Sequence, residues 1–182
     1  MHVKAKQVAF LGLLAAVVSI LIILASVIET NTLFLMAAAA FLVGVSVREY
    51  GIRIGFGFFV ACILLGFLLS PNKLYVLTYT GFSFYILWDE VAYTVLARAF
   101  FQKYRKMLFY ISKFLLFNLL YLPVLLLFPK IIFAGELSVP ILILLIVAGQ
   151  VGWIIYDKAY EYFQIKVWGK IRHKLGVGKY SK

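Results

Sequence analysis

Hydrophobic residues occur along the chain in long runs that short polar segments interrupt. Most runs approach the roughly 20 residues that a helix needs to cross about 30 Å of hydrocarbon. The second run is Ala-rich and shorter, and needs its flanking residues to cross. Six membrane-spanning helices are predicted, at Val8 to Ile28, Leu33 to Val47, Ile54 to Leu69, Leu74 to Ala97, Leu108 to Phe128 and Val139 to Tyr156.

The composition agrees with an all-α polytopic membrane protein. Hydrophobic residues make up 65% of the 182 residues and charged residues only 14%, too few to form a soluble surface around so much apolar sequence. A single cysteine, Cys62, excludes a disulfide scaffold, and with only two histidines the chain has too few ligands for a zinc site of the Cys/His type. No metal and no cofactor are expected.

Basic residues fall almost entirely on one side of the predicted spans. Of the 18 lysines and arginines, 15 lie on the side that holds both termini; Lys73 and Lys130 lie on the other, and Lys113 lies just inside the fifth span. Because cytoplasmic loops carry the excess of basic residues, both termini are predicted to be cytoplasmic in a multi-pass protein of the cell membrane. The net charge of +11 reflects this topology, and nucleic acid is not expected as a partner.

The sequence divides into residues 1–156, which form the six-helix transmembrane domain, and residues 157–182, a basic cytoplasmic tail. Apolar residues recur in the tail at three- and four-residue intervals, at Tyr160, Phe163, Val167, Ile171 and Leu175. This spacing predicts an amphipathic helix at the inner interface of the membrane. Such a helix either anchors the last span to lipid or binds a partner's cytoplasmic surface.

Four polar residues inside the spans require partners. Asp89 and Glu90 lie in the inner half of the fourth span, where a carboxylate is costly. An ion pair with Arg48 or Arg53 is favoured over a proton relay, because no intramembrane chain of His or Lys residues accompanies the acids. Asn118 and Gln150 predict either a hydrogen bond between spans five and six or the polar floor of a ligand cavity.

Small residues form a stripe along the first span, at Ala5, Ala9, Gly12 and Ala16, which suits internal packing or the docking of another membrane subunit. The outer loops bring several polar and aromatic residues together. They indicate either an aromatic belt or a small-molecule site. These residues are Glu29, Asn31, Asn72, Lys73, Tyr75, Tyr79 and Glu136.

Enzymatic activity is not expected. Both histidines, His2 and His173, lie outside the spans, so Cys62 has no evident catalytic base. The sequence has no His-Glu-x-x-His zinc motif and no Gly-x-x-x-x-Gly-Lys-Ser/Thr phosphate loop. Energy for uphill transport would have to come from a partner or an ion gradient.

Two motifs carry a resemblance to a known family. The inner turn Val-Arg-Glu-Tyr-Gly-Ile-Arg-Ile-Gly (Val47 to Gly55) and the loop Leu-Leu-Ser-Pro-Asn-Lys (Leu68 to Lys73) occur within six short helices that follow a basic start. Over about residues 4 to 95 the chain resembles the substrate-binding S components of energy-coupling factor (ECF) transporters. Where this chain has Trp88-Asp89-Glu90, members of that family often carry a basic residue.

The resemblance implies an S component that captures a vitamin-like micronutrient outside the cell. It further implies partners, a transmembrane coupling subunit with two cytoplasmic ATPase subunits, docked on the stripe of Ala5, Ala9, Gly12 and Ala16. The substrate-binding candidates are Asn72, Tyr75, Tyr79, Asn118, Tyr121 and Glu136. The alternative functions are a membrane scaffold of cell-envelope machinery, resembling small rod-shape proteins, and an ion-coupled carrier in which Asp89 or Glu90 titrates.

Overall fold

Every regular element of the described chain is a helix, which confirms the predicted all-α class. The computed structural model describes residues 2–97, 104–127 and 138–175. Each of the six predicted spans lies almost entirely in one long helix, and the sixth helix continues well beyond Tyr156. The elements are α1 (His2–Val27), a 3-10 turn (Glu29–Asn31), α2 (Thr32–Tyr50), α3 (Ile52–Leu69), α4 (Lys73–Ala97), α5 (Arg105–Leu127), α7 (Val139–Tyr162), a π-helical segment (Phe163–Trp168) and α8 (Gly169–Leu175).

Among the described helices, five are long and apolar enough to cross a membrane, and α4 is not one of them. Polar side chains along α4 lower its hydropathy, among them Ser83, Asp89 and Glu90, all of which are buried. A helix that contacts α1, α2, α3 and α5, as α4 does, presents little surface to lipid and can carry such residues. Its position inside the bundle therefore explains the lower hydropathy.

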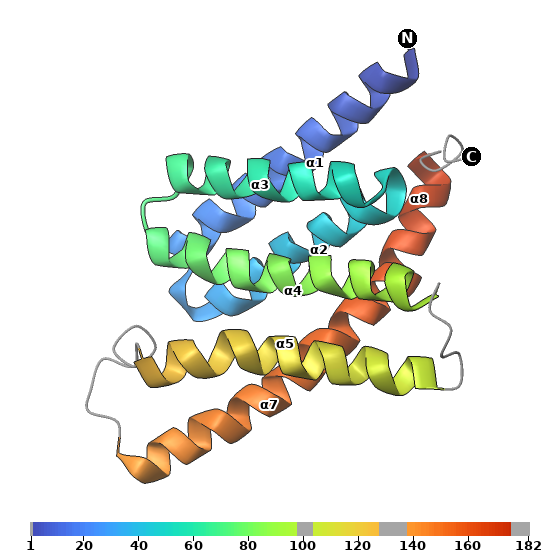
Figure 1. Cartoon of the computed structure of the whole chain (residues 1–182). Helices are drawn as coiled ribbons and strands as arrows, with labels where there is room; N and C mark the ends of the chain where they lie inside the picture. Colours follow the sequence, from blue (N-terminus) through green and yellow to red (C-terminus); the bar gives the residue numbers. More distant parts are fainter. Residues whose placement is uncertain (1, 98–103, 128–137, 176–182) are drawn as a thin grey trace.

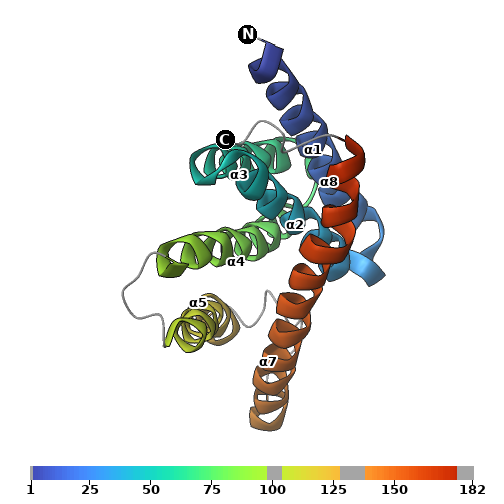
Figure 2. The same cartoon turned by 90° about the vertical axis from the view of Figure 1, so that its right-hand side faces the viewer.

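The helices form one bundle in which α2, α3, α4 and α5 run roughly side by side while α1 and α7 cross them obliquely (Figures 1 and 2). α2 packs against α1, α3 and α4, and α5 packs against α4 and α7. The start of α1 and the end of α8 lie toward the end of the bundle where α4 ends and α5 begins (Figure 1). We call this the basic end, because Arg48, Lys106 and Arg172 belong to it.

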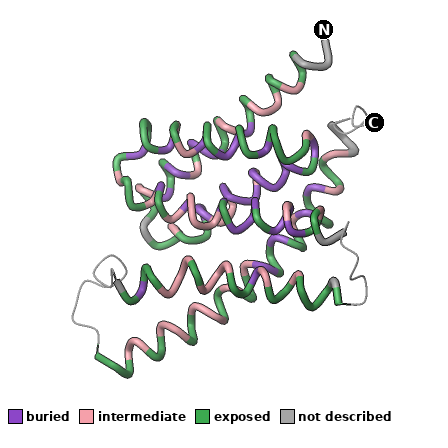
Figure 3. The backbone as a smooth tube through the Cα atoms, viewed as in Figure 1, coloured by how far each residue is buried: buried purple, intermediate pink, exposed green. Residues whose placement is uncertain are grey.

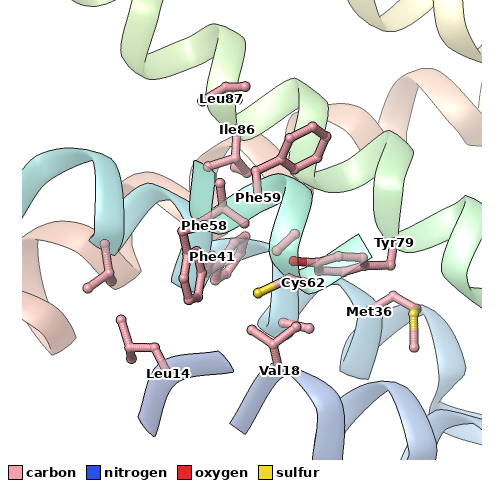
Figure 4. Close-up of a cluster of buried hydrophobic side chains, with 14 of the residues drawn as sticks. Leu14, Val18, Met36, Phe41, Phe58, Phe59, Cys62, Tyr79, Ile86 and Leu87 are labelled. Carbon is pink, nitrogen blue, oxygen red and sulfur yellow. The ribbon is translucent and has the colours of Figure 1, made fainter. Parts of the chain in front are cut away.

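Burial is concentrated in the first four helices. Figure 3 shows buried positions mainly along α1 to α4, whereas α5 and the first half of α7 are largely exposed or half-buried. At the centre, Val18 of α1, Met36 of α2, Cys62 of α3 and Tyr79 of α4 are all fully buried (Figure 4). The outer surfaces of the helices are apolar, as expected for a bundle whose solvent is lipid.

Local chemistry fixes the two tight connections within the first four helices. Gly51 ends α2 with a φ of 87°, a conformation that side chains with a Cβ rarely adopt, and so lets α3 begin one residue later. Between α3 and α4, the Asn72 side chain accepts a hydrogen bond from the Leu74 backbone N–H at 3.0 Å. Asn72 thus caps the start of α4.

The predicted tail helix is continuous with α7. Its packed face follows the predicted apolar row at Tyr160 and Phe163 but departs from that row further on, because a π-helical turn adds a residue and rotates the helix. Tyr160, Gln164 and Trp168 are buried against the bundle, whereas Val167 and Ile171 are exposed. The boundary predicted after Tyr156 therefore falls inside a helix, and the placement of residues 157–175 at the membrane interface stays a prediction.

Candidate functional site

Charged side chains from four helices meet near the basic end of the bundle. Arg48 lies in the last turn of α2, Asp89 and Glu90 lie in the second half of α4, Lys113 lies near the start of α5, and Asp157 lies in the second half of α7. The alternating helix directions bring these positions to a similar depth. We call these five residues the charged cluster.

Glu90 is held from two sides. Arg48 Nε lies 2.6 Å from Glu90 Oε1, and the hydroxyl of Tyr160 donates a hydrogen bond to the same oxygen. Gln164 Nε2 donates in turn to the Tyr160 hydroxyl at 3.1 Å. The predicted ion pair between a carboxylate of α4 and Arg48 is therefore present. Together with the Tyr160 hydrogen bond, it joins α2, α4 and α7.

Gly44 makes room for the Tyr160 side chain. A Cβ at position 44 would lie 2.7 Å from Cζ of the Tyr160 ring, closer than van der Waals contact allows. The absence of a side chain on this turn of α2 therefore lets Tyr160 reach Glu90.

Asp89 pairs with a lysine that the sequence analysis had not assigned to it. Lys113 Nζ lies 2.7 Å from Asp89 Oδ1 and also forms an ion pair with Asp157. All three residues are buried, and Lys113 is only 4% exposed. The partners predicted for the acids were Arg48 and Arg53, so the pairing of Asp89 with Lys113 was missed. The signal available in the sequence was one isolated lysine in the fifth span, at the depth of Asp89.

Aromatic residues complete the surroundings of Asp157. The Tyr85 hydroxyl donates to Asp157 Oδ1 at 2.9 Å, and Trp153 Nε1 donates to the Tyr85 hydroxyl at 2.8 Å. The Lys113 ammonium lies 4.7 Å from the centroid of the Phe109 ring. These contacts offset the cost of burying charges, which is large unless each charge is paired and hydrogen-bonded.

A cavity of about 960 Å³ opens beside the charged cluster. Its volume is at the upper end of the range of small-molecule sites. The cluster's side chains form much of its polar wall, and the rest comes from the ends of α2, α4, α5 and α7, the start of α3, the π-helical segment and α8. Its lining includes charged, aromatic and apolar residues, among them Arg48, Asp89, Glu90, Tyr93, Val95, Phe109, Tyr110, Lys113, Asp157, Glu161 and Arg172.

A second buried carboxylate joins the tail to α2. Trp168 Nε1 donates to Glu49 Oε1 at 2.8 Å, and Arg172 Nε lies 3.3 Å from the same oxygen. Glu49 is 4% exposed. The tail is therefore docked on the bundle by specific polar contacts as well as by apolar packing.

The substrate-binding residues predicted from the sequence are not brought together around this cavity. Asn72 caps α4, Tyr75 is half-buried against the core, and Tyr79 is fully buried within it. Tyr121 donates to the Leu145 backbone oxygen at 2.8 Å, in the interface between α5 and α7. Glu136 lies outside the described residues.

Asn118 and Gln150 form the predicted hydrogen bond between the fifth and sixth spans. Gln150 Nε2 donates to Asn118 Oδ1 at 2.8 Å, and Asn118 Nδ2 donates to the Phe114 backbone oxygen at 2.9 Å. This pair joins α5 to α7 at a point where α7 is otherwise largely exposed. The contact accounts for the Asn118 amide and for Gln150 Nε2 without a ligand, whereas Gln150 Oε1 is buried with no hydrogen-bond partner among the described residues.

The small-residue stripe of α1 faces outward. Ala5, Ala9, Gly12 and Ala16 are exposed, and a Cβ added at Gly12 would meet no atom within 4 Å. The opposite face of α1 is packed in the core through buried residues. These are Leu14, Val18, Ile22 and Ala25. The stripe therefore stays outside the packing among the residues that the structure describes.

Comparisons with known proteins add no further assignment. No family model matches the chain, and searches of curated proteins and of solved structures find no match.

Proposed function

We propose that this chain is a non-enzymatic, substrate-binding subunit of a membrane uptake transporter, of the type that S components represent. The observation that carries the proposal is the cavity of about 960 Å³ beside the charged cluster. Ionisable residues at membrane depth are costly, and proteins retain them mainly where substrates or ions pass. A vitamin-like micronutrient is a suitable size of cargo for such a cavity.

The excess of basic residues on one side supports a cytoplasmic location for both termini and for the basic end. The cavity then opens toward the cytoplasm. In an uptake subunit that captures its ligand outside, this is the side of release. The chain would be a multi-pass protein of the cell membrane in this proposal, surrounded by membrane lipid.

A partner must supply energy under this proposal, because the chain carries no phosphate-binding loop. The outward stripe of Ala5, Ala9, Gly12 and Ala16 is a surface on which another membrane helix can approach closely. The expected partner is a transmembrane coupling subunit that carries ATPase subunits.

Copurification tests the proposal. The unaltered chain, expressed at its natural level and purified in mild detergent, is expected to bring down a membrane subunit and ATP-hydrolysing subunits in fixed ratio. The double variant Gly12→Leu with Ala16→Leu should lose them, because leucine side chains keep a docked helix at a distance. The matched control is Gly152→Leu on α7, where a Cβ also meets nothing within 4 Å. Retention of the ATPases by the double variant would contradict the proposal.

A second candidate, a scaffold of cell-envelope machinery, is favoured by a different observation. The predicted outer ligand residues that the structure describes are used in capping, in core packing and in contacts between helices. A scaffold needs the outward face of α1 but no ligand. It would copurify with envelope-synthesis proteins in place of ATPases.

A further inference from the structure

We propose that the cavity at the basic end binds a small organic cation, held as a protonated amine between the buried carboxylates and the aromatic rim. This inference names the substrate class of the proposed transport subunit and in that sense rests on the proposed function. Its binding test does not depend on any partner.

The formal charges around the cavity leave one carboxylate in excess. The lining residues include four acids, Asp89, Glu90, Asp157 and Glu161, and three basic residues, Arg48, Lys113 and Arg172. Adding Glu49 and Lys158, the ion-pair partners of Arg172 and Glu161, leaves the balance unchanged. A bound monovalent cation would neutralise the site, and neutralisation is strongly favoured where carboxylates are buried.

The carboxylates also keep acceptor capacity. The contacts found for the described residues engage Oδ1 of Asp89, Oδ1 of Asp157 and Oε1 of Glu90. The second oxygen of each carboxylate takes part in none of those contacts, although all three residues line the cavity. A carboxylate accepts several hydrogen bonds, so an ammonium group can donate to these oxygens without displacing Arg48 or Lys113.

Aromatic rings supply the second element of amine recognition. The rings of Tyr93 and Phe109 lie 6.3 Å apart and those of Phe109 and Tyr110 lie 5.9 Å apart, both nearly edge to face. All three residues line the cavity. The Lys113 ammonium is already recognised by carboxylates and an aromatic ring together. Two carboxylates bind it, and it lies 4.7 Å from the Phe109 ring centroid. A ligand ammonium would repeat this geometry.

A metal ion fits the cavity less well than an amine. Within the described residues, no group of three Asp, Glu, Cys or His side chains is arranged to hold a metal ion. The cavity is also far larger than a single ion, and part of its wall is apolar and aromatic. An amine with an organic body satisfies both the charge and the volume.

Ligand charge is the variable that tests the inference. The unaltered protein in dodecyl maltoside micelles is titrated with benzylammonium, benzyl alcohol and benzoate, and binding is read from thermal unfolding and from tryptophan fluorescence. Benzylammonium should bind roughly tenfold or more tightly than the other two, which control for partitioning into the micelle. Equal stabilisation by all three, or by none, would overturn the inference.

Two substitutions locate the bound amine. Tyr93→Ala should weaken benzylammonium binding about fivefold, the effect of losing one cation–π contact. Tyr162→Ala, which removes a tyrosine of similar exposure (63% against 61%) outside the cavity, should leave it unchanged. Asp89→Asn should weaken it roughly tenfold, since it removes the excess charge. Identical affinities for Tyr93→Ala and Tyr162→Ala would place the amine elsewhere and refute the site.

A lipid could supply the same chemistry, because the ethanolamine headgroup is also a protonated primary amine. Addition of phosphatidylethanolamine to the micelles distinguishes the sources: competition with benzylammonium identifies the headgroup as an occupant, and no competition identifies a soluble amine. Failure of the amine to bind while ATPase subunits copurify would refute only this inference. Amine binding without such subunits would refute only the transport proposal.

Discussion

Lys113 of α5 and Asp89 of α4 form a buried ion pair of 2.7 Å in a part of the bundle where α5 is otherwise largely exposed. Lys113 also pairs with Asp157 of α7. One ammonium group therefore connects the compact first four helices to the two helices at their side. The position of α5 against α4 depends on this connection, whereas α7 is also held on α4 by the hydrogen bonds of Tyr160 to Glu90 and of Tyr85 to Asp157.

Replacing Lys113 with methionine should reduce the free energy of unfolding by about 3–5 kcal/mol, because two buried carboxylates lose their cation. Lys158→Met is the matched control. Lys158 pairs with Glu161 at 2.9 Å, but both side chains are more than half exposed. Such a pair contributes about 1 kcal/mol or less. Unfolding by increasing mole fractions of sodium dodecyl sulfate measures the free energy of unfolding of both variants. An equal decrease in the two variants would contradict the role given to Lys113.

Gly44→Ala should destabilise the protein by about 1–3 kcal/mol, because the added Cβ forces Tyr160 away from Glu90. Gly57→Ala on α3 adds the same methyl group at a position with no atom within 4 Å. That control should be neutral or slightly stabilising, since alanine favours a helix more than glycine does. Thermal unfolding in detergent compares the two. A Gly44→Ala variant as stable as the control would show that Tyr160 is not held as described.

Trp168→Phe should release the tail from α2. The substitution removes the indole N–H that donates to the buried Glu49 carboxylate and leaves Arg172 on that oxygen; a hydrogen bond to a charged group contributes about 1.5–3 kcal/mol. Limited trypsin digestion should then cleave faster at Lys166, Lys170 and Arg172. Trp88→Phe, on an exposed side chain of α4, is the control and should digest at the original rate. Unchanged cleavage of Trp168→Phe would mean that the hydrogen bond does not anchor the tail.

The Asn118–Gln150 hydrogen bond can be measured by a double-mutant cycle with leucine at one or both positions. Coupling energies of such bonds within membranes average about 0.6 kcal/mol and reach about 1.7 kcal/mol. We expect a value within this range, because neighbouring contacts, including the Tyr121–Leu145 hydrogen bond and the packing of Phe117 on Trp153, hold α5 against α7 at the same place. A coupling energy of zero would leave the pair without a structural role and favour a ligand as its partner.

The sequence predicted the helices well because the length of each apolar run is a direct consequence of membrane thickness. The turn at Gly51 and the cap at Asn72 are also readable locally, since each depends on one residue's own chemistry. The Arg48–Glu90 pair could be predicted from the sequence because both residues lie at the same end of neighbouring spans.

The charged cluster as a whole could not be predicted from the sequence in the same way. Which acid pairs with Lys113 depends on how α4, α5 and α7 are rotated about their axes, and hydropathy leaves rotation undetermined. Asp157 was assigned to the tail because the apolar run ends at Tyr156, yet the helix continues through it. The π-helical turn then changed which tail residues pack inward, and a spacing of three and four residues cannot anticipate such an insertion.

In our proposal, the cavity beside the charged cluster opens on the cytoplasmic side of the membrane. Cys62 is the only cysteine and is buried, so a Cys62→Ala background allows single-cysteine labelling. A cysteine in place of Val95, an exposed residue that lines the cavity, is treated with a membrane-impermeant maleimide in intact cells and in inverted vesicles. A cysteine in place of Pro71, in the connection between α3 and α4, reports the opposite side. We predict that position 95 is labelled only in inverted vesicles and position 71 only in intact cells; labelling of position 95 from outside the cell would contradict the account.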